Sequence, residues 1–403
     1  MAKGPLADLF NEFHSSIEDR KIGALTMIDD RASRFGGLSR AGKHYAPPLI
    51  AFAAARVVLH IGGINGEPPS SSADGWARWD SGLYLDLAKN GYTFFPCAED
   101  PALACGNAGW MPGFPWIVRP LLAAGLPPAL AGALVAAAFC LGFLTVIWIF
   151  WLREDCSVKG VGALVAVAVA PGTIYQHAVF PVSMLLCLVA IQGELVVRRR
   201  WGCAALVGAG AALTYATGFL VAVADVLGSP VRTDARRRLA GILGALGVGA
   251  GLGALFLIHR LQVGRWNAFF VTQAKYGHGL SSPLGTLASF LGLIASANPE
   301  ARVVGIQILS TVVFVLLGLW GAIVSARANG PASDRFAAVL MLAFFIVPLT
   351  LGTGVSPIRA EALLAPAGVL LRWLPRWIVA LWLVAATWMA WATSAVFFAG
   401  HLV

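Results

Sequence analysis

The chain has 403 residues, of which 58% are hydrophobic and 12% charged. Soluble proteins carry about 25% charged residues, so this composition excludes a soluble globular protein and favours a protein that is solvated by lipid. The formal net charge is +9, but the basic residues form short clusters between apolar segments and no stripe with interleaved aromatic residues. This distribution excludes a nucleic-acid-binding protein.

The first segment, residues 1–45, is polar and basic, and it lacks the apolar core of a cleavable signal peptide. Clusters of Lys and Arg beside membrane spans are typical of cytoplasmic loops. We therefore expect a cytoplasmic basic tail over residues 1–45, either disordered or lying on the membrane surface. A single transmembrane domain is expected to follow over residues 46–403.

Apolar segments long enough to cross a bilayer, which takes about 20 residues, recur along the rest of the chain. They predict an all-α polytopic membrane protein with about eleven transmembrane helices. The expected spans are residues 46–63, 128–151, 160–176, 179–197, 201–214, 217–228, 238–258, 302–325, 335–352, 360–372 and 377–399.

The basic clusters test this arrangement. Those around Arg153, Arg198, Arg236 and Arg372 all fall on the same side of the expected membrane as the basic tail. By the positive-inside rule, the N-terminus is then cytoplasmic and the C-terminus lies outside.

Two long segments are less apolar and are expected outside the membrane, at about residues 64–127 and 259–301. The first is rich in Trp and Tyr, which are comfortable at the membrane–water interface, so we predict interfacial helices there. It also holds Cys97 and Cys105. Because both cysteines would lie in one loop of an oxidising compartment, we predict that they form a disulfide.

A carboxylate at the membrane–water interface can serve as a base, and cations on nearby elements can hold a phosphate. Asp80 is the strongest candidate for the base, because it lies among aromatic residues in the first outer loop. The alternative is that Asp80 caps the helix predicted to begin at Ser81. The other acids of this loop are interpreted as solvated charges: Asp74, Asp86, Glu99 and Asp100.

Arg265, Lys275 and Arg359 are cations expected on the outer side that could meet a phosphate, although each alone is more often an interfacial anchor or an ion-pair partner. His177, at the end of a predicted span, could belong to the same site or simply form a hydrogen bond at the interface. No metal-ligand spacing is present, and we expect no cofactor.

One motif resembles a known family. The residues Arg78-Trp79-Asp80-Ser81-Gly82-Leu83-Tyr84 precede Asn90-Gly91-Tyr92. This order resembles the PIG-V-like mannosyltransferases, whose first outer loop carries Arg-Trp-Asp-Ser, a following Tyr, and then Gly-Tyr. Weaker likenesses extend over about residues 75–365, including Ala268-Phe269, Gln273, Tyr276-Gly277 and Arg359.

The resemblance implies the membrane glycosyltransferase fold called GT-C, and a bacterial cytoplasmic membrane as the location. It implies transfer of a sugar, expected to be mannose, from a polyprenyl-phosphate carrier to a lipid-linked or glycan acceptor on the outer face. Asp80 would be the general base of a single inverting displacement. The lipid-phosphate sugar would then be a substrate. Substrate binding would involve Arg78, Trp79, Tyr84, His177, Arg265, Gln273, Lys275, Tyr276 and Arg359.

The sequence departs from the family pattern at three places. Tyr215 and Ala216 replace an Arg-Pro pair, Val182 stands where relatives often carry Glu, and Ala360 replaces a Tyr. These departures keep a non-catalytic assembly subunit open. A transporter or flippase for a lipid-linked sugar also stays open, because it would have the same composition and similar cations on the outer side. A transporter is expected to carry charged residues in several spans, and here the notable ones are Arg56, Glu194 and Asp225.

Overall fold

The computed structural model describes residues 42, 44–228, 235–277, 279–352 and 356–401. The expected tail, residues 1–45, therefore lies almost entirely outside the described residues. The chain divides after Pro47 into two units, and the second, Pro48–Val403, contains the core and both of the outer loops expected from the sequence.

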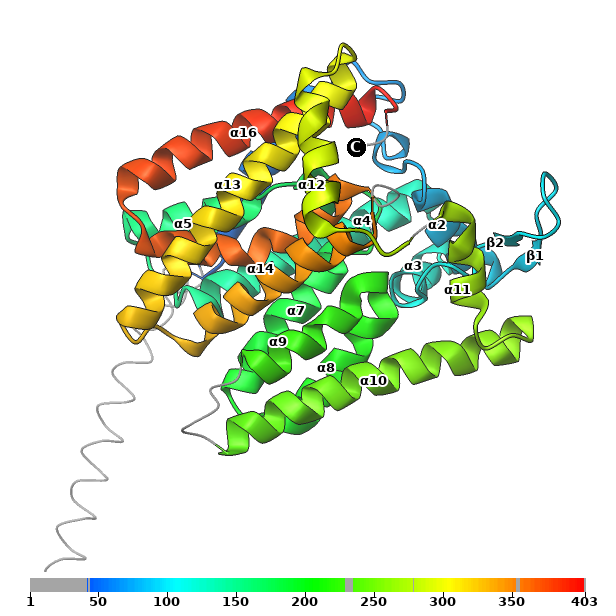
Figure 1. Ribbon diagram of the computed structural model, residues 1–403, viewed down its shortest axis with the longest axis horizontal. Helices are drawn as coiled ribbons and strands as arrows, with labels where there is room; N and C mark the ends of the chain where they lie inside the picture. Colours follow the sequence, from blue (N-terminus) through cyan, green and yellow to red (C-terminus); the bar gives the residue numbers. More distant parts are fainter. Residues whose placement is uncertain (1–41, 43, 229–234, 278, 353–355, 402–403) are drawn as a thin grey trace, which may run out of the picture. The chain divides into compact units, whose positions relative to one another are not determined.

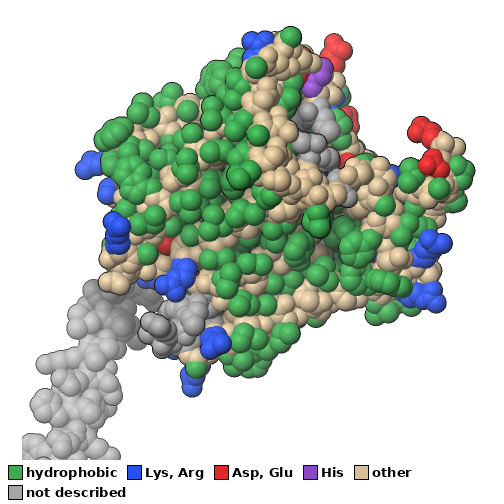
Figure 2. Space-filling view, in the orientation of Figure 1, with side chains coloured by type: hydrophobic (Ala, Val, Ile, Leu, Met, Phe, Trp, Pro, Cys, Tyr) green, Lys and Arg blue, Asp and Glu red, His purple; other side chains and the backbone are tan. Residues whose placement is uncertain are grey.

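Six helices are long and apolar enough to cross a membrane, by length and composition, within the described ranges. Each coincides with one of the spans predicted from the sequence, and Figure 2 shows a broad hydrophobic surface with Lys and Arg at its margins. The six are the first helix, His44–Gly63; α4 (Pro128–Val146) with its π-helical extension η2 (Ile147–Trp151); α10 (Ala235–Val263); α13 (Pro299–Arg327); α14 (Ala332–Thr350); and α16 (Arg376–Phe398).

The other five predicted spans form helices shorter than these six, although α8 has the bounds predicted for it, residues 201–214. The span at 160–176 ends early because Pro171 and Gly172, the latter at φ +70°, interrupt the helix. These segments form α5 (Val158–Ala168), with the short α6 (Ile174–His177) after it; α7 (Val182–Val197); α8 (Trp201–Thr214); η3 (Ala216–Leu220) with α9 (Val221–Leu227); and η6 (Ala362–Trp373).

The last of these, η6, is a 3₁₀ helix rather than the α-helix expected at 360–372. A 3₁₀ helix rises about 2 Å per residue, so its twelve residues extend about 24 Å. Its residues from Ala362 to Leu371 are all buried, and a Cβ on Gly368 would lie 2.7 Å from the backbone nitrogen of Val167 in α5. Close packing against neighbouring helices therefore holds this stretched segment inside the protein.

Small residues join α8 and α10, which run side by side (Figure 1). A Cβ on Gly247 would lie 2.0 Å from the carbonyl oxygen of Ala205, and one on Gly251 would lie 2.5 Å from that of Ala209. The two backbones approach this closely because glycine has no side chain, as at many helix contacts in membranes.

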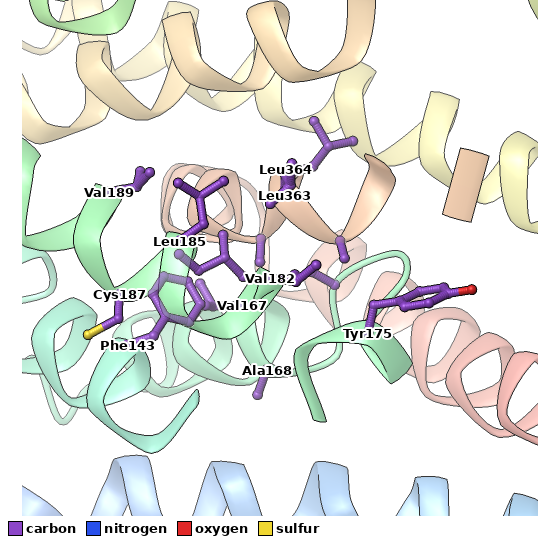
Figure 3. Packing of buried hydrophobic residues seen from close by; sticks show 14 of the residues in the cluster. Phe143, Val167, Ala168, Tyr175, Val182, Leu185, Cys187, Val189, Leu363 and Leu364 are labelled. Atoms are coloured by element: carbon purple, nitrogen blue, oxygen red, sulfur yellow. The ribbon is translucent and has the colours of Figure 1, made fainter. Parts of the chain in front are cut away.

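The core is built around α7. Its residues Val182 and Leu185 pack with Phe143 of α4, Val167 of α5 and Leu363 of η6 (Figure 3). Since helices from distant parts of the chain converge here, this core fixes the loops that follow them.

The first outer loop contains the interfacial helices expected from its sequence and a two-stranded antiparallel hairpin. Phe95 pairs with Cys105 in the hairpin, and helix α11 (Ala268–Gln273) of the second loop contacts strand β2 (Ala104–Gly106; Figure 1). The elements are η1 (Asp74–Trp76), α2 (Ser81–Asn90), β1 (Phe94–Pro96), β2 (Ala104–Gly106) and α3 (Gly113–Ala123). The second loop forms α11 (Ala268–Gln273), η4 (Ala274–Tyr276), α12 (Pro283–Gly292) and η5 (Leu293–Ala295), and α15 (Pro357–Glu361) precedes η6.

Candidate functional site

Asp80 and Arg359 form an ion pair, although they are 279 residues apart in the chain. The guanidinium of Arg359 donates from Nη1 to Oδ2 of Asp80, and the two side chains are 15% and 25% exposed respectively. Asp80 directly precedes α2, and Arg359 lies on α15. The structure thus brings together two of the charged residues that the sequence marked as candidates.

The side chain of Asp80 does not cap α2, which was the alternative role predicted for it. Its side chain makes no capping hydrogen bond to α2, and only its backbone carbonyl accepts from the amides of Leu83 and Tyr84. The carboxylate is therefore available to Arg359. The preceding residue, Trp79, has φ +45°, a left-handed conformation that is uncommon for a bulky residue. Backbone strain of this kind clusters at functional sites.

Aromatic rings surround the ion pair. The Arg359 guanidinium lies 5.6 Å from the ring centre of Tyr175 and 5.0 Å from that of Phe180. Tyr84 is buried, and its ring meets that of Phe180 edge-on. Burial, together with the nearby Tyr215 and Asp80, raises the pKa of Tyr84 well above its ordinary value, so its hydroxyl stays protonated.

Tyr276 also belongs to this group. Its pKa is raised by burial and by the charge of Asp80, while the charge of Arg359 acts in the opposite direction. Trp110 meets the Tyr276 ring edge-on, and the neighbouring Gln273 donates to the carbonyl oxygen of Gly109 at 2.7 Å. Gln273 therefore ties the second outer loop to the first rather than reaching the ion pair.

Arg265 and Lys275 lie at the hairpin. The Arg265 guanidinium is 5.5 Å from the ring centre of Phe94, and Nζ of Lys275 is 4.0 Å from Sγ of Cys105. Cys105 is bonded to Cys97, with 5.0 Å between their Cα atoms. The two cations, predicted to bind phosphate, thus contact the disulfide hairpin in this structure and not Asp80.

Arg78 and His177 also have other neighbours than the ion pair. Arg78 donates to the carbonyl oxygens of Glu67, Pro68 and Phe398, which joins the first outer loop to the end of α16. His177 is 1% exposed and stacks on Phe52. Of the predicted substrate-binding residues, Trp79, Tyr84, Tyr276 and Arg359 are those that the structure gathers around Asp80.

Two further residues at the site were not predicted, Tyr175 and Tyr215. Tyr215 is close enough for the charges of Arg359 and Asp80 to act on its hydroxyl, and Tyr175 lies beneath the guanidinium. Tyr175 precedes the chosen His177 by two residues. Tyr215 stands where the resembling family carries Arg, so that departure was the signal that could have marked it.

One interpretation from the sequence was wrong. Asp86 is not a solvated loop charge, because its Oδ2 accepts from the buried Asn107 at 2.7 Å and its Oδ1 accepts from Asn90 at 2.7 Å. Asn107 also donates to the carbonyl oxygen of Gly91 and accepts from the amide of Thr93. Asp86 therefore holds the turn that connects α2 to the hairpin.

The fold is similar to that of oligosaccharyltransferases from the archaeon Archaeoglobus fulgidus. A crystal structure of that enzyme in the apo form shares 13% identity at a TM-score of 0.51, over 89% of this chain and 56% of that one. A complex of it with an inhibitory peptide and a dolichol-phosphate gives 12% identity and a TM-score of 0.49, over 87% and 56% of the two chains. No protein-family model and no curated protein matches the chain.

The chain thus spans little more than half the length of these enzymes. At such low identity, the likeness shows the fold alone. This is the all-α polytopic membrane fold of the GT-C type, as predicted from the sequence.

Proposed function

We propose that the protein is a membrane glycosyltransferase of the PIG-V-like kind. It takes mannose from a polyprenyl-phosphate carrier and transfers it to a lipid-linked or glycan acceptor on the outer face of a bacterial cytoplasmic membrane. The observation that carries this proposal is the ion pair between Asp80 and Arg359, inside a ring of tyrosines and beside a strained Trp79.

The pair supplies the two groups that the reaction needs. Asp80 takes the proton of the acceptor hydroxyl as that oxygen bonds to the anomeric carbon of the sugar. The bond from this carbon to the phosphate oxygen breaks, and the phosphate leaves with the electron pair. Arg359 stabilises the charge that develops on the phosphate. Attack opposite to the leaving group inverts the anomeric configuration.

Arg359 keeps a donor for the phosphate. Its Nη1 donates to Asp80, while its Nε is buried and has no hydrogen-bond partner among the described residues. An unpaired buried donor is costly, and the planar guanidinium fork suits a phosphate with two acceptor oxygens. A bound phosphate would therefore occupy Arg359 and leave Asp80 free to face the acceptor hydroxyl.

The direct test is an assay of the purified protein in liposomes made from the lipids of its host. Labelled polyprenyl-phosphate mannose and labelled GDP-mannose are supplied in parallel. The proposal predicts that label from the lipid carrier enters a product and that label from the nucleotide sugar does not. Transfer from the nucleotide sugar alone, or label crossing the bilayer without a product, would replace the proposal with a nucleotide-sugar enzyme or a transporter respectively.

A further inference from the structure

Arg56 is a positive charge within the first apolar helix, His44–Gly63. It lies seven residues before Gly63, which is about 10 Å along an α-helix. Among the described residues, no carboxylate forms an ion pair with it. Charged residues inside membrane spans are costly and normally have a counter-charge, so this arginine requires an explanation.

The protein satisfies Arg56 only in part. Its Nη1 donates to the backbone carbonyl of His177 at 3.1 Å, and its guanidinium carbon lies 3.3 Å from the ring centre of Trp76. These contacts fix the orientation of the guanidinium but bring no negative charge. Arginine has five N–H donors, and among the described residues the backbone carbonyl of His177 accepts from Nη1 of Arg56.

Two polar side chains, His177 and Cys140, lie close to Arg56. His177 stacks on Phe52 with 5.1 Å between ring centres, and its Nε2 lies 3.8 Å from Sγ of Cys140. Nδ1 of His177 is buried without a partner in the described part of the chain. Arg56 is half-buried, and none of its nitrogens is among the fully buried side-chain atoms without a partner in the described residues, so its remaining donors are open to a ligand.

We infer that Arg56 is the anchor of a binding site for the phosphate group of a membrane lipid. A phosphate would supply the missing negative charge and accept from the fork of the guanidinium. The Arg359 guanidinium faces the ring of Tyr175 in α6, whereas Arg56 donates to the backbone carbonyl of His177, the last residue of that helix. The two arginines therefore contact different residues of α6, and the site at Arg56 does not depend on the proposed transferase activity.

Native mass spectrometry of the detergent-solubilised full chain tests this site. The protein is titrated with phosphatidylglycerol, with undecaprenyl phosphate, and with diacylglycerol, which has no phosphate. Wild-type protein should bind one of the two phosphate lipids, or both, in preference to diacylglycerol. Which phosphate lipid binds more tightly identifies the source as a bulk phospholipid or a polyprenyl carrier, and either result supports a phosphate site.

Variants show whether Arg56 is the anchor. Arg56→Met should weaken phosphate-lipid binding about tenfold or more, since it removes charge-assisted hydrogen bonds. Arg56→Lys keeps the charge but loses the fork, so it should bind several-fold more weakly than wild type and serves if the Met variant does not fold. Arg302→Met, which removes an exposed arginine near the start of α13, is the matched control and should bind as wild type does.

Arg359→Gln separates this site from the proposed donor site, because it should leave phosphatidylglycerol binding unchanged. The inference is overturned if wild type binds diacylglycerol as tightly as the phosphate lipids. It is equally overturned if Arg56→Lys, together with Arg56→Met when that variant folds, binds phosphate lipids with wild-type affinity.

Discussion

Asp80 and Arg359 were each marked from the sequence, but nothing in the sequence places them in contact. Asp80 was marked because it lies in the motif Arg78 to Tyr84 of the first outer loop. Arg359 was marked because it is a cation between two expected spans. Their pairing depends on how α6, α15 and the start of α2 pack, which is a property of the folded chain. For the same reason, Tyr175 and Tyr215 could not be placed beside them from spacing alone.

The arginine of this pair gives the first prediction. Arg359→Gln should lower the rate of sugar transfer by about 10²- to 10³-fold. It removes the cationic hydrogen-bond donor that stabilises the negative charge developing on the leaving phosphate. Arg359→Lys should recover part of this loss, since it keeps the charge but not the fork. Initial rates at several donor concentrations measure both effects. Transfer at the wild-type rate by Arg359→Gln would show that Arg359 serves structure only.

At the scale of single elements, apolar length predicted the six long helices well, and it failed where proline and glycine interrupt a segment. The helix in the expected span at 160–176 ends at Ala168, just before Pro171, and the expected α-helix at 360–372 is the buried 3₁₀ helix η6. Hydropathy predicts that a short apolar segment is removed from water, but it does not tell whether lipid or protein covers the segment. Segments inside the protein can be short, since they do not have to match the bilayer thickness.

The close contact between α8 and α10 can be tested directly. Gly247→Ala places a methyl group 2.0 Å from the carbonyl oxygen of Ala205, so the helices must move apart. Overpacking of this kind costs about 1–3 kcal/mol. Gly249→Ala is the matched control, because a Cβ there meets nothing within 4 Å. We expect the melting temperature to fall for Gly247→Ala but not for Gly249→Ala. Equal melting temperatures of the two variants would contradict the close contact between α8 and α10.

The hairpin gives a prediction of its own. Cys97 and Cys105 are bonded across a register that pairs Cys105 with Phe95, and a disulfide closing so short a loop stabilises by about 2–3 kcal/mol. Replacing both cysteines with Ser should make the loop between them a faster target for limited proteolysis, while the apolar helices stay intact. Alkylation of the unreduced, denatured protein checks the bond itself. Full labelling of both cysteines without reductant would refute it.

At the scale of the whole molecule, the positive-inside rule predicts how the chain is oriented in the membrane. The basic tail is expected in the cytoplasm and the C-terminus outside. Single cysteines introduced at Ser15 and at His401, in a background without the native cysteines, can be labelled from one side of the membrane at a time. Labelling of both from the same side would contradict this topology and would place the site at Asp80 in doubt as an outer-face site.

The central claim is that Asp80 is the base that takes the proton of the acceptor, and one comparison tests it most directly. Asp80→Asn keeps the size of the side chain and removes the carboxylate, and general-base catalysis contributes about 10²- to 10⁴-fold in rate. The matched control is Asp74→Asn in the same loop, whose exposed carboxylate has no hydrogen bond or ion pair among the described residues.

Both variants are compared with wild type for mannose transfer from polyprenyl-phosphate mannose, after thermal melting has shown that they are folded. The account predicts that Asp80→Asn binds the lipid donor but transfers at least about a hundredfold more slowly, while Asp74→Asn transfers at the wild-type rate. Wild-type transfer by folded Asp80→Asn would contradict the account, and the pair with Arg359 would then be a structural contact between α15 and the first outer loop.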